Sequence, residues 1–109
     1  MKLRLACLAL LAGCTTMISS SPPPSDWPEL QVVAILAPVD EMLSVCRKYG
    51  SEVACALIDF DRRRCTIVFR DDRPVDKFVS AHEREHCRGK DHPGEDTLRR
   101  AWEAWKARP

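Results

Sequence analysis

The stretch that organises the chain is residues 82–92, which read HEREHCRGKDH. His82 and His86 are four residues apart, so on a helix they lie on one face with their Cβ atoms about 5–6 Å apart. This spacing allows both imidazoles to bind one Zn²⁺ ion at about 2.0–2.1 Å. Glu83, next to His82, can hydrogen-bond a water on that ion without binding the ion itself. The stretch therefore predicts a helix that carries a metal site with an acidic neighbour.

Two further positions complete the pattern. Gly89 can adopt a positive φ and end the helix, so that the chain turns and His92 returns as a third nitrogen ligand. Three protein ligands leave a fourth position open, which is typical of a catalytic zinc site rather than a structural one. All three histidines of the chain lie in this stretch. The alternative is a helix whose surface histidines bind no metal. It is disfavoured because the only three histidines of the chain all fall at these spacings.

Residues 82–92 resemble the HExxHxxGxxH zinc-binding motif of the metzincin metallopeptidases. The resemblance implies that Zn²⁺ is bound by His82, His86 and His92, with Glu83 as the general base and a peptide or protein as substrate. Metzincins also carry a methionine-containing turn downstream of the third histidine. The methionines of this chain all precede the motif, at Met1, Met17 and Met42. A small, stand-alone HExxH scaffold therefore fits better than the full metzincin fold.

The alternative function is a non-catalytic zinc-binding lipoprotein of the cell envelope, acting as a structural or interaction module. Glu83 distinguishes the two hypotheses, because a structural or carrier site does not need a glutamate at this position and fills its fourth coordination position.

The composition disfavours nucleic-acid binding. The 109 residues include 17 Lys and Arg against 16 Asp and Glu, which gives a net charge of +1. Removal of Lys2 and Arg4 with a leader peptide would leave 15 basic against 16 acidic residues. Neither balance provides the basic surface that nucleic acids require. The length allows one domain.

The N-terminus has the pattern of a bacterial lipoprotein signal. A basic start is followed by an apolar run at residues 5–12, which is typical of a secretory signal and too short to span a bilayer. The run ends in LAGC at residues 11–14, which resembles a lipobox. The resemblance implies that residues 1–13 are removed and that Cys14 carries lipid. Thr15, in place of an aspartate, favours the outer membrane, facing the periplasm. The alternative is an ordinary cleaved signal in which Cys14 is incidental.

Residues 14–29 are rich in Ser, Thr and Pro, and they include the run Pro22-Pro23-Pro24. This composition predicts an extended tether with polyproline character between the lipid anchor and the domain. Trp27 is a candidate for the point where the folded part begins. We therefore place the zinc-binding, metallopeptidase-like domain at residues 30–109.

The apolar patterns predict an α+β fold. We expect a small single domain in which a β-hairpin or short antiparallel sheet packs on the HExxH helix, with flanking N- and C-terminal helices. The expected elements are a strand or the start of a helix at 30–36, a helix at 38–48, a hairpin of 53–60 and 65–70, the HExxH helix at 74–88, and a final helix at 95–107. Asp72 is the candidate N-cap of the HExxH helix, with Pro74 near its first position. In HExxH peptidases an edge strand pairs with the extended substrate, and here either hairpin strand could do so.

Four cysteines follow the anchor: Cys46, Cys55, Cys65 and Cys87. In an oxidising compartment they predict two disulfides, each worth about 2–4 kcal/mol. Cys55 lies far from the hairpin turn and Cys65 beside it, so a bond between them is disfavoured. This weakly favours bonds from Cys46 and Cys87 into the hairpin. Metal binding by Cys87 is also disfavoured, because on a helix it points about 100° away from its neighbour in sequence.

Two supporting roles stay open at the level of the sequence. Tyr49, Arg88 and Lys90 are candidates for stabilising an oxyanion. Asp91 or Glu85 could orient a ligand imidazole. All five are also compatible with ordinary solvated side chains.

Overall fold

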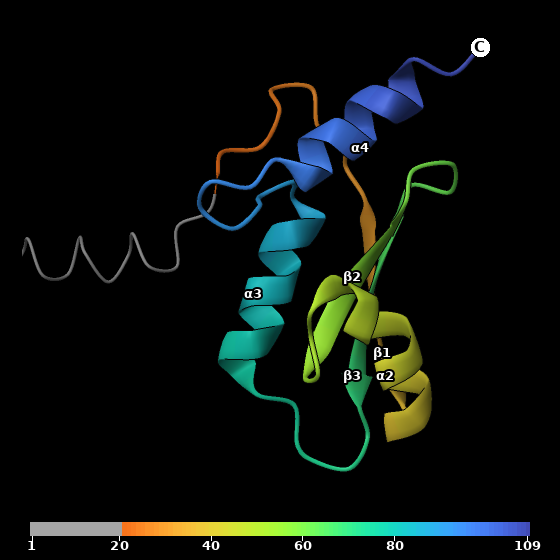
Figure 1. The fold of residues 1–109 in the computed structure, drawn as a ribbon, viewed down its shortest axis with the longest axis vertical. Helices are drawn as coiled ribbons and strands as arrows, with labels where there is room; N and C mark the ends of the chain where they lie inside the picture. Colours follow the sequence, from red (N-terminus) through yellow and green to blue (C-terminus); the bar gives the residue numbers. More distant parts are fainter. Residues whose placement is uncertain (1–20) are drawn as a thin grey trace, which may run out of the picture.

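The computed structural model describes residues 21–109 and shows a small α+β domain, which confirms the predicted fold class. The predicted leader and the predicted lipidation site, Cys14, lie outside the described residues. The elements are β1 (Gln31–Ala37), α2 (Val39–Cys46), a 3₁₀ helix (Arg47–Tyr49), β2 (Ala54–Asp59), β3 (Arg64–Arg70), α3 (Lys77–Cys87) and α4 (Thr97–Lys106) (Figure 1). No helix in residues 21–109 is both long and apolar enough to cross a membrane.

The three strands form one sheet in the order β1-β3-β2. The predicted hairpin is present, with β2 antiparallel to β3 and Cys55 opposite Val68. The stretch that could have been a strand or a helix start is the strand β1, which runs parallel to β3 with Ile35 opposite Val68. A parallel pair needs a crossover connection, and α2 with β2 supplies it. The sheet is therefore mixed, with β1 and β2 as its two edges.

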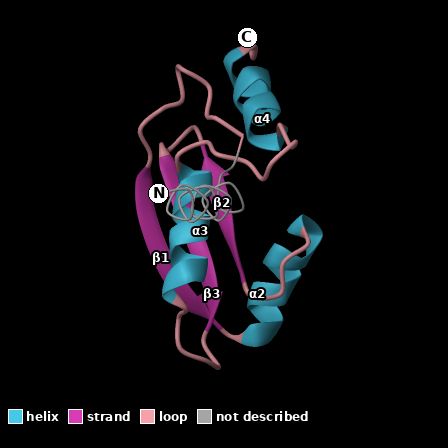
Figure 2. Cartoon of the chain, turned by 90° about the vertical axis from the view of Figure 1, so that its left-hand side faces the viewer, coloured by secondary structure: helices cyan, strands magenta, loops and turns pink. Residues whose placement is uncertain are grey.

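Helices α2 and α3 cover opposite faces of this sheet (Figures 1 and 2). Successive side chains of a strand point to opposite faces, so Val68 packs with Met42 under α2, while Ile67 and Phe69 pack under α3. Both faces of the central strand β3 are covered, so β3 reads as a nearly continuous apolar run rather than an alternating one, whereas most residues of the edge strand β1 are exposed.

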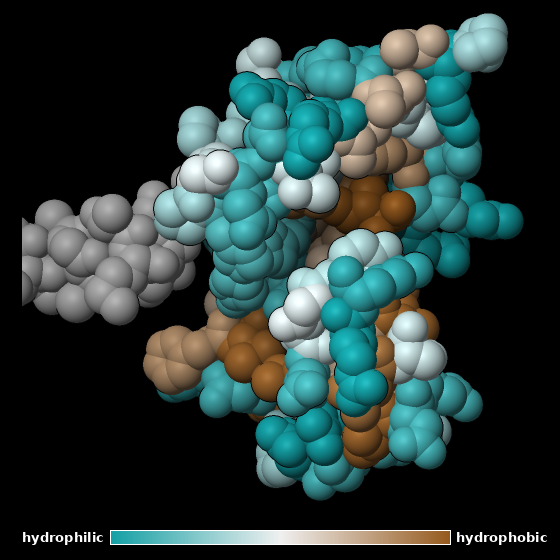
Figure 3. Space-filling view, viewed as in Figure 1, coloured by the Kyte–Doolittle hydropathy of each residue, from teal (hydrophilic) through white to brown (hydrophobic). Residues whose placement is uncertain are grey.

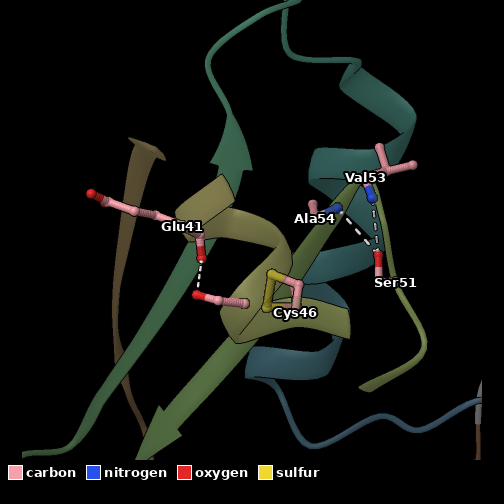
Figure 4. The surroundings of a disulfide bond; sticks show 7 residues. Glu41, Cys46, Ser51, Val53 and Ala54 are labelled. Atoms are coloured by element: carbon pink, nitrogen blue, oxygen red, sulfur yellow. Dashed lines mark hydrogen bonds between the residues drawn. A yellow bond between two sulfur atoms is a disulfide. The ribbon is translucent and has the colours of Figure 1, made fainter. Parts of the chain in front are cut away.

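Each face of the sheet carries one disulfide. Cys46–Cys55 joins the end of α2 to β2, and Cys65–Cys87 joins β3 to the last residue of α3. The expected bonds from Cys46 and Cys87 into the hairpin are thus confirmed, and Cys87 is not a free thiolate that could bind metal. Figure 4 shows the Cys46–Cys55 bond beside a turn that precedes β2. In this turn the Ser51 hydroxyl accepts hydrogen bonds from the backbone N–H groups of Val53 and Ala54.

Helix α3 begins three residues later than predicted, at Lys77. Its N-cap is Asp76, whose Oδ1 accepts hydrogen bonds from the N–H groups of Phe78 and Val79 at 2.7 and 3.2 Å. Asp72, the predicted cap, instead pairs with Arg70. The prediction was wrong because three aspartates with the same capping chemistry precede the helix, at positions 71, 72 and 76, and the pattern alone could not choose among them.

Residues 21–29, which we assigned to the tether, pack against the end of α3 and against α4 (Figure 1, orange). The Trp27 indole N–H donates a hydrogen bond to the carbonyl of Cys87 at 3.0 Å. Its ring lies edge-on to Phe60 and Trp102, with centroids 5.4 and 6.1 Å away. The packed part of the chain therefore extends N-terminally beyond residue 30.

Candidate metal centre

The three histidines of the chain converge on one point. The Nε2 atom of His82 lies 3.0 Å from that of His92 and 3.1 Å from that of His86. Each ring offers one nitrogen, and these ligand atoms all lie within 4.8 Å of one another, so the three can hold one metal ion. Within residues 21–109, no other group of His, Cys, Asp or Glu side chains has this arrangement.

The local sequence explains this convergence. Helix α3 places His82 and His86 one turn apart on one face. The helix then ends at Gly89, whose φ is +86°. The N–H of Gly89 donates to the carbonyl of His86, and the N–H of Lys90 donates to the carbonyl of Glu85, which together form a Schellman motif. This turn reverses the chain and returns His92 to the face of α3 that carries the other two ligands.

Hydrogen bonds at the far side of two rings fix how they face the centre. The Nδ1 of His86 lies 2.7 Å from the carbonyl oxygen of Lys90, and the Nδ1 of His92 lies 3.3 Å from a carboxylate oxygen of Glu95. Both partners only accept hydrogen bonds, so each neutral ring carries its proton on Nδ1 and turns the lone pair of Nε2 inward. This is the tautomer that a metal-binding imidazole requires.

The third ring cannot satisfy both of these lone pairs. His82 brings its Nε2 close to both neighbouring Nε2 atoms, and it can place at most one proton there. At least one pair of nitrogens therefore meets lone pair to lone pair, an arrangement that a shared cation stabilises. Burial, followed by the charges of His86 and His92, lowers the pKa of His82 and so favours the neutral form that binds a metal.

Glu83 is buried, with 7% of its surface exposed, and lies in the wall of the cleft that holds the histidines. Burial raises the pKa of its carboxyl to about 7, and the neighbouring His92 lowers it by a smaller amount. A buried carboxyl of this kind is typical of functional sites. It lines the same cleft as the three convergent imidazoles, which makes it the candidate acid–base group of the centre.

The cleft has a volume of about 750 Å³ and lies between α3 and the hairpin. All three histidines and Glu83 line it on one side, and the edge-strand residues Ala54–Ala56 line it on the other. Its rim carries exposed apolar side chains, of which Phe78 is 73% exposed. Figure 3 shows such side chains at the surface over the N-terminal end of α3.

Of the candidates for oxyanion stabilisation, Tyr49 lines the cleft and is exposed. Arg88 and Lys90 instead pair with Glu85, at 3.1 and 2.9 Å. The two ion pairs hold the side chains of Arg88 and Lys90 at the end of α3. Tyr49 is therefore the candidate that faces the cleft.

The two carboxylates expected to orient an imidazole have other partners. Glu85 forms the ion pairs just described, and the buried Asp91 accepts a hydrogen bond from the N–H of Leu98 at 2.7 Å, at the start of α4. The orienting groups are instead Glu95 and the carbonyl of Lys90, which the sequence reasoning missed. The position of Glu95, three residues after His92, could have suggested it, whereas a backbone carbonyl leaves no signal in the sequence.

No family model, curated protein or solved structure matches this chain. The fold and the three histidines define it as a small, disulfide-bonded α+β domain with a candidate metal centre. Its chemistry is therefore inferred from the residues of that centre.

We expect Glu83→Gln to stabilise the metal-free protein at pH 8 and to change it little at pH 4. The folded protein holds the pKa of Glu83 at about 7, above its ordinary value of 4.5. Stability from the neutral carboxyl is therefore fully present below about pH 4.5 and is lost as the pH rises through 7. At 1.36 kcal/mol per pKa unit, the variant gains at most about 3 kcal/mol at pH 8.

Urea unfolding of the metal-free protein at pH 4, 6 and 8 measures this difference. Glu41→Gln, which changes an exposed glutamate on α2, is the matched control and should show no such trend. An equal effect of Glu83→Gln at pH 4 and pH 8 would contradict the burial of an ionisable carboxyl.

Proposed function

We propose that the protein is a zinc-dependent hydrolase, and specifically a small, membrane-anchored metallopeptidase. The observation that carries this proposal is the convergence of three Nε2 atoms beside the buried Glu83 in an open cleft. Tetrahedral ligands at zinc bond lengths lie about 3.3 Å apart, close to the 3.0 and 3.1 Å between His82 and its two neighbours. The three-nitrogen set, with a fourth position facing the cleft, fits catalytic zinc.

The residues of the centre suit hydrolysis of an amide bond. Zinc held by His82, His86 and His92 would supply a Lewis acid that acidifies water and polarises a carbonyl group. Glu83 would take the proton from the attacking water and deliver it to the leaving amine. Lys90 and Glu95, through their bonds to Nδ1, would hold two of the imidazoles in the correct tautomer and orientation.

An extended peptide suits this cleft as substrate. Strand β2 is an edge of the sheet, so one row of its backbone N–H and C=O groups is not used by β3. Part of this strand lines the same cleft as the histidines, and β3 is the central strand with both sides paired, so β2 is the hairpin strand open to pairing with an extended chain. The exposed apolar rim, including Phe78 and Val53, favours substrates with apolar side chains near the cleaved bond.

The proposed location is the bacterial cell envelope, at the outer membrane facing the periplasm, with lipid on Cys14. There the substrate would be an envelope protein or a peptide of the cell wall. Labelling cells with a radioactive fatty acid should mark the wild type and not Cys14→Ser, and the variant should leave the membrane fraction. A labelled Cys14→Ser protein would contradict the anchor.

The proposed function is tested by zinc analysis and a peptide library. The purified chain should contain one zinc per molecule and cleave peptides, and removal of zinc should abolish cleavage until it is restored. Binding of one zinc without cleavage across a broad library would support the non-catalytic zinc-binding lipoprotein instead. A native protein without zinc would contradict both.

A further inference from the structure

We propose that residues 21–27, which we call the strap, are a positioning element for the third metal ligand, His92. This inference rests on the proposed zinc centre. His82 and His86 are fixed by α3, whereas His92 lies on the loop between α3 and α4. A ligand on a loop is held only as well as the backbone on either side of it.

Ser21 holds that backbone directly. Its N–H donates to the carbonyl oxygen of Asp91 at 2.8 Å, and its hydroxyl donates to the carbonyl oxygen of His92 at 3.2 Å. Ser21 therefore binds the carbonyl of His92 and that of the residue before it, although it precedes His92 by 71 residues in the sequence. The contact adds an isolated antiparallel bridge between Ser21 and Asp91 to an otherwise irregular loop.

Trp27 holds the turn from which the loop departs. Its indole N–H donates to the carbonyl oxygen of Cys87, the last residue of α3. Its ring lies so close to Gly89 that a Cβ atom at that position would come within 2.5 Å of it. Gly89 is therefore required twice, for its positive φ and for the approach of this ring.

The strap acts on the loop rather than on α3 as a whole. Its polar contacts reach the final carbonyl of α3, the loop residues Asp91 and His92 and, through the ion pair of Asp26 with Lys106, the end of α4, which follows the loop. The other two ligands have independent support, because the helix carries both and the Cys65–Cys87 disulfide fixes its end. Loss of the strap should thus loosen one ligand of three. Outer contacts of this kind typically change metal affinity by about 10–100-fold.

The test compares Ser21→Pro, which removes both donors, with Ser21→Ala, which removes only the hydroxyl. Ser25→Ala, at an exposed position of the same segment, is the matched control. Competition with a chromophoric chelator measures the zinc affinity of each full-length protein. We expect a loss of about tenfold for Ser21→Pro, a smaller loss for Ser21→Ala and none for the control. The visible spectrum of the cobalt-substituted protein should weaken in the same order.

Hydrogen–deuterium exchange of the metal-free proteins separates positioning from general stability. In Ser21→Pro, residues 89–96 should exchange faster while residues 77–87 keep their protection. Trp27→Phe, which retains an aromatic ring but loses the indole N–H, should show the same pattern and serves if Ser21→Pro does not fold. Unchanged zinc affinity, or equal loss of protection in α3, overturns the strap while the zinc centre stands. Absence of zinc binding in the wild type overturns both.

Discussion

Glu83→Gln should bind zinc as tightly as the wild type and lose about 10³-fold in turnover, within the range of 10²–10⁴ typical of a general base. The amide has the size of the carboxylate but cannot accept a proton from water. Glu83 is absent from the set of convergent ligand atoms, which consists of His82, His86 and His92, so its replacement leaves the ligands intact. The measurement is kcat on a peptide that the wild type cleaves, together with zinc content.

Glu85→Gln is the matched control, because it changes the same residue type on the same helix. Glu85 pairs with Lys90 and Arg88 at the end of α3 and takes no part in the cleft wall. The control should keep both zinc and turnover. Retention of more than a tenth of the activity by Glu83→Gln, or an equal loss in Glu85→Gln, would contradict the assignment of Glu83 as the base.

The parts of the centre that depend on spacing along the chain could be predicted from the sequence. The helical period places His82 and His86 on one face, and Gly89 marks the turn that returns His92. The hairpin also follows from local patterns. Its geometry disfavours a bond between Cys55 and Cys65, but which of them pairs with Cys46 and which with Cys87 is settled only by the structure. In each case the interacting residues are close in sequence or are limited to few partners.

The features that the sequence did not predict depend on packing between distant segments. The parallel pairing of β1 with β3 is set by how the crossover folds, and an apolar run carries no sign of strand direction. Residues 21–29 have the composition of a tether. Composition does not indicate that Ser21 hydrogen-bonds the loop between α3 and α4, or that Trp27 hydrogen-bonds the end of α3. The same holds for the carbonyl of Lys90, since any residue type supplies a backbone carbonyl.

Removal of the Cys65–Cys87 disulfide should have the largest effect on stability. The bond closes a separation of 22 residues, for which the loop-entropy relation gives about 3 kcal/mol. The Cys65→Ala/Cys87→Ala protein should therefore melt about 12–24 °C lower. Small domains have about 5–15 kcal/mol in total, so the metal-free variant should be only marginally folded at 37 °C.

The Cys46–Cys55 bond provides the comparison, because it closes 9 residues and is worth about 2.5 kcal/mol by the same relation. It joins α2 to β2 and makes no link to α3. Cys87, in contrast, follows His86 directly, and its carbonyl oxygen accepts the hydrogen bond of the Trp27 indole N–H. Cys65→Ala/Cys87→Ala should thus lose zinc affinity, and Cys46→Ala/Cys55→Ala should keep it despite a similar loss of stability. Urea unfolding of both proteins and chelator competition at a temperature where both are folded make this comparison. Equal zinc affinities would show that α3 holds its ligands without the covalent link to β3.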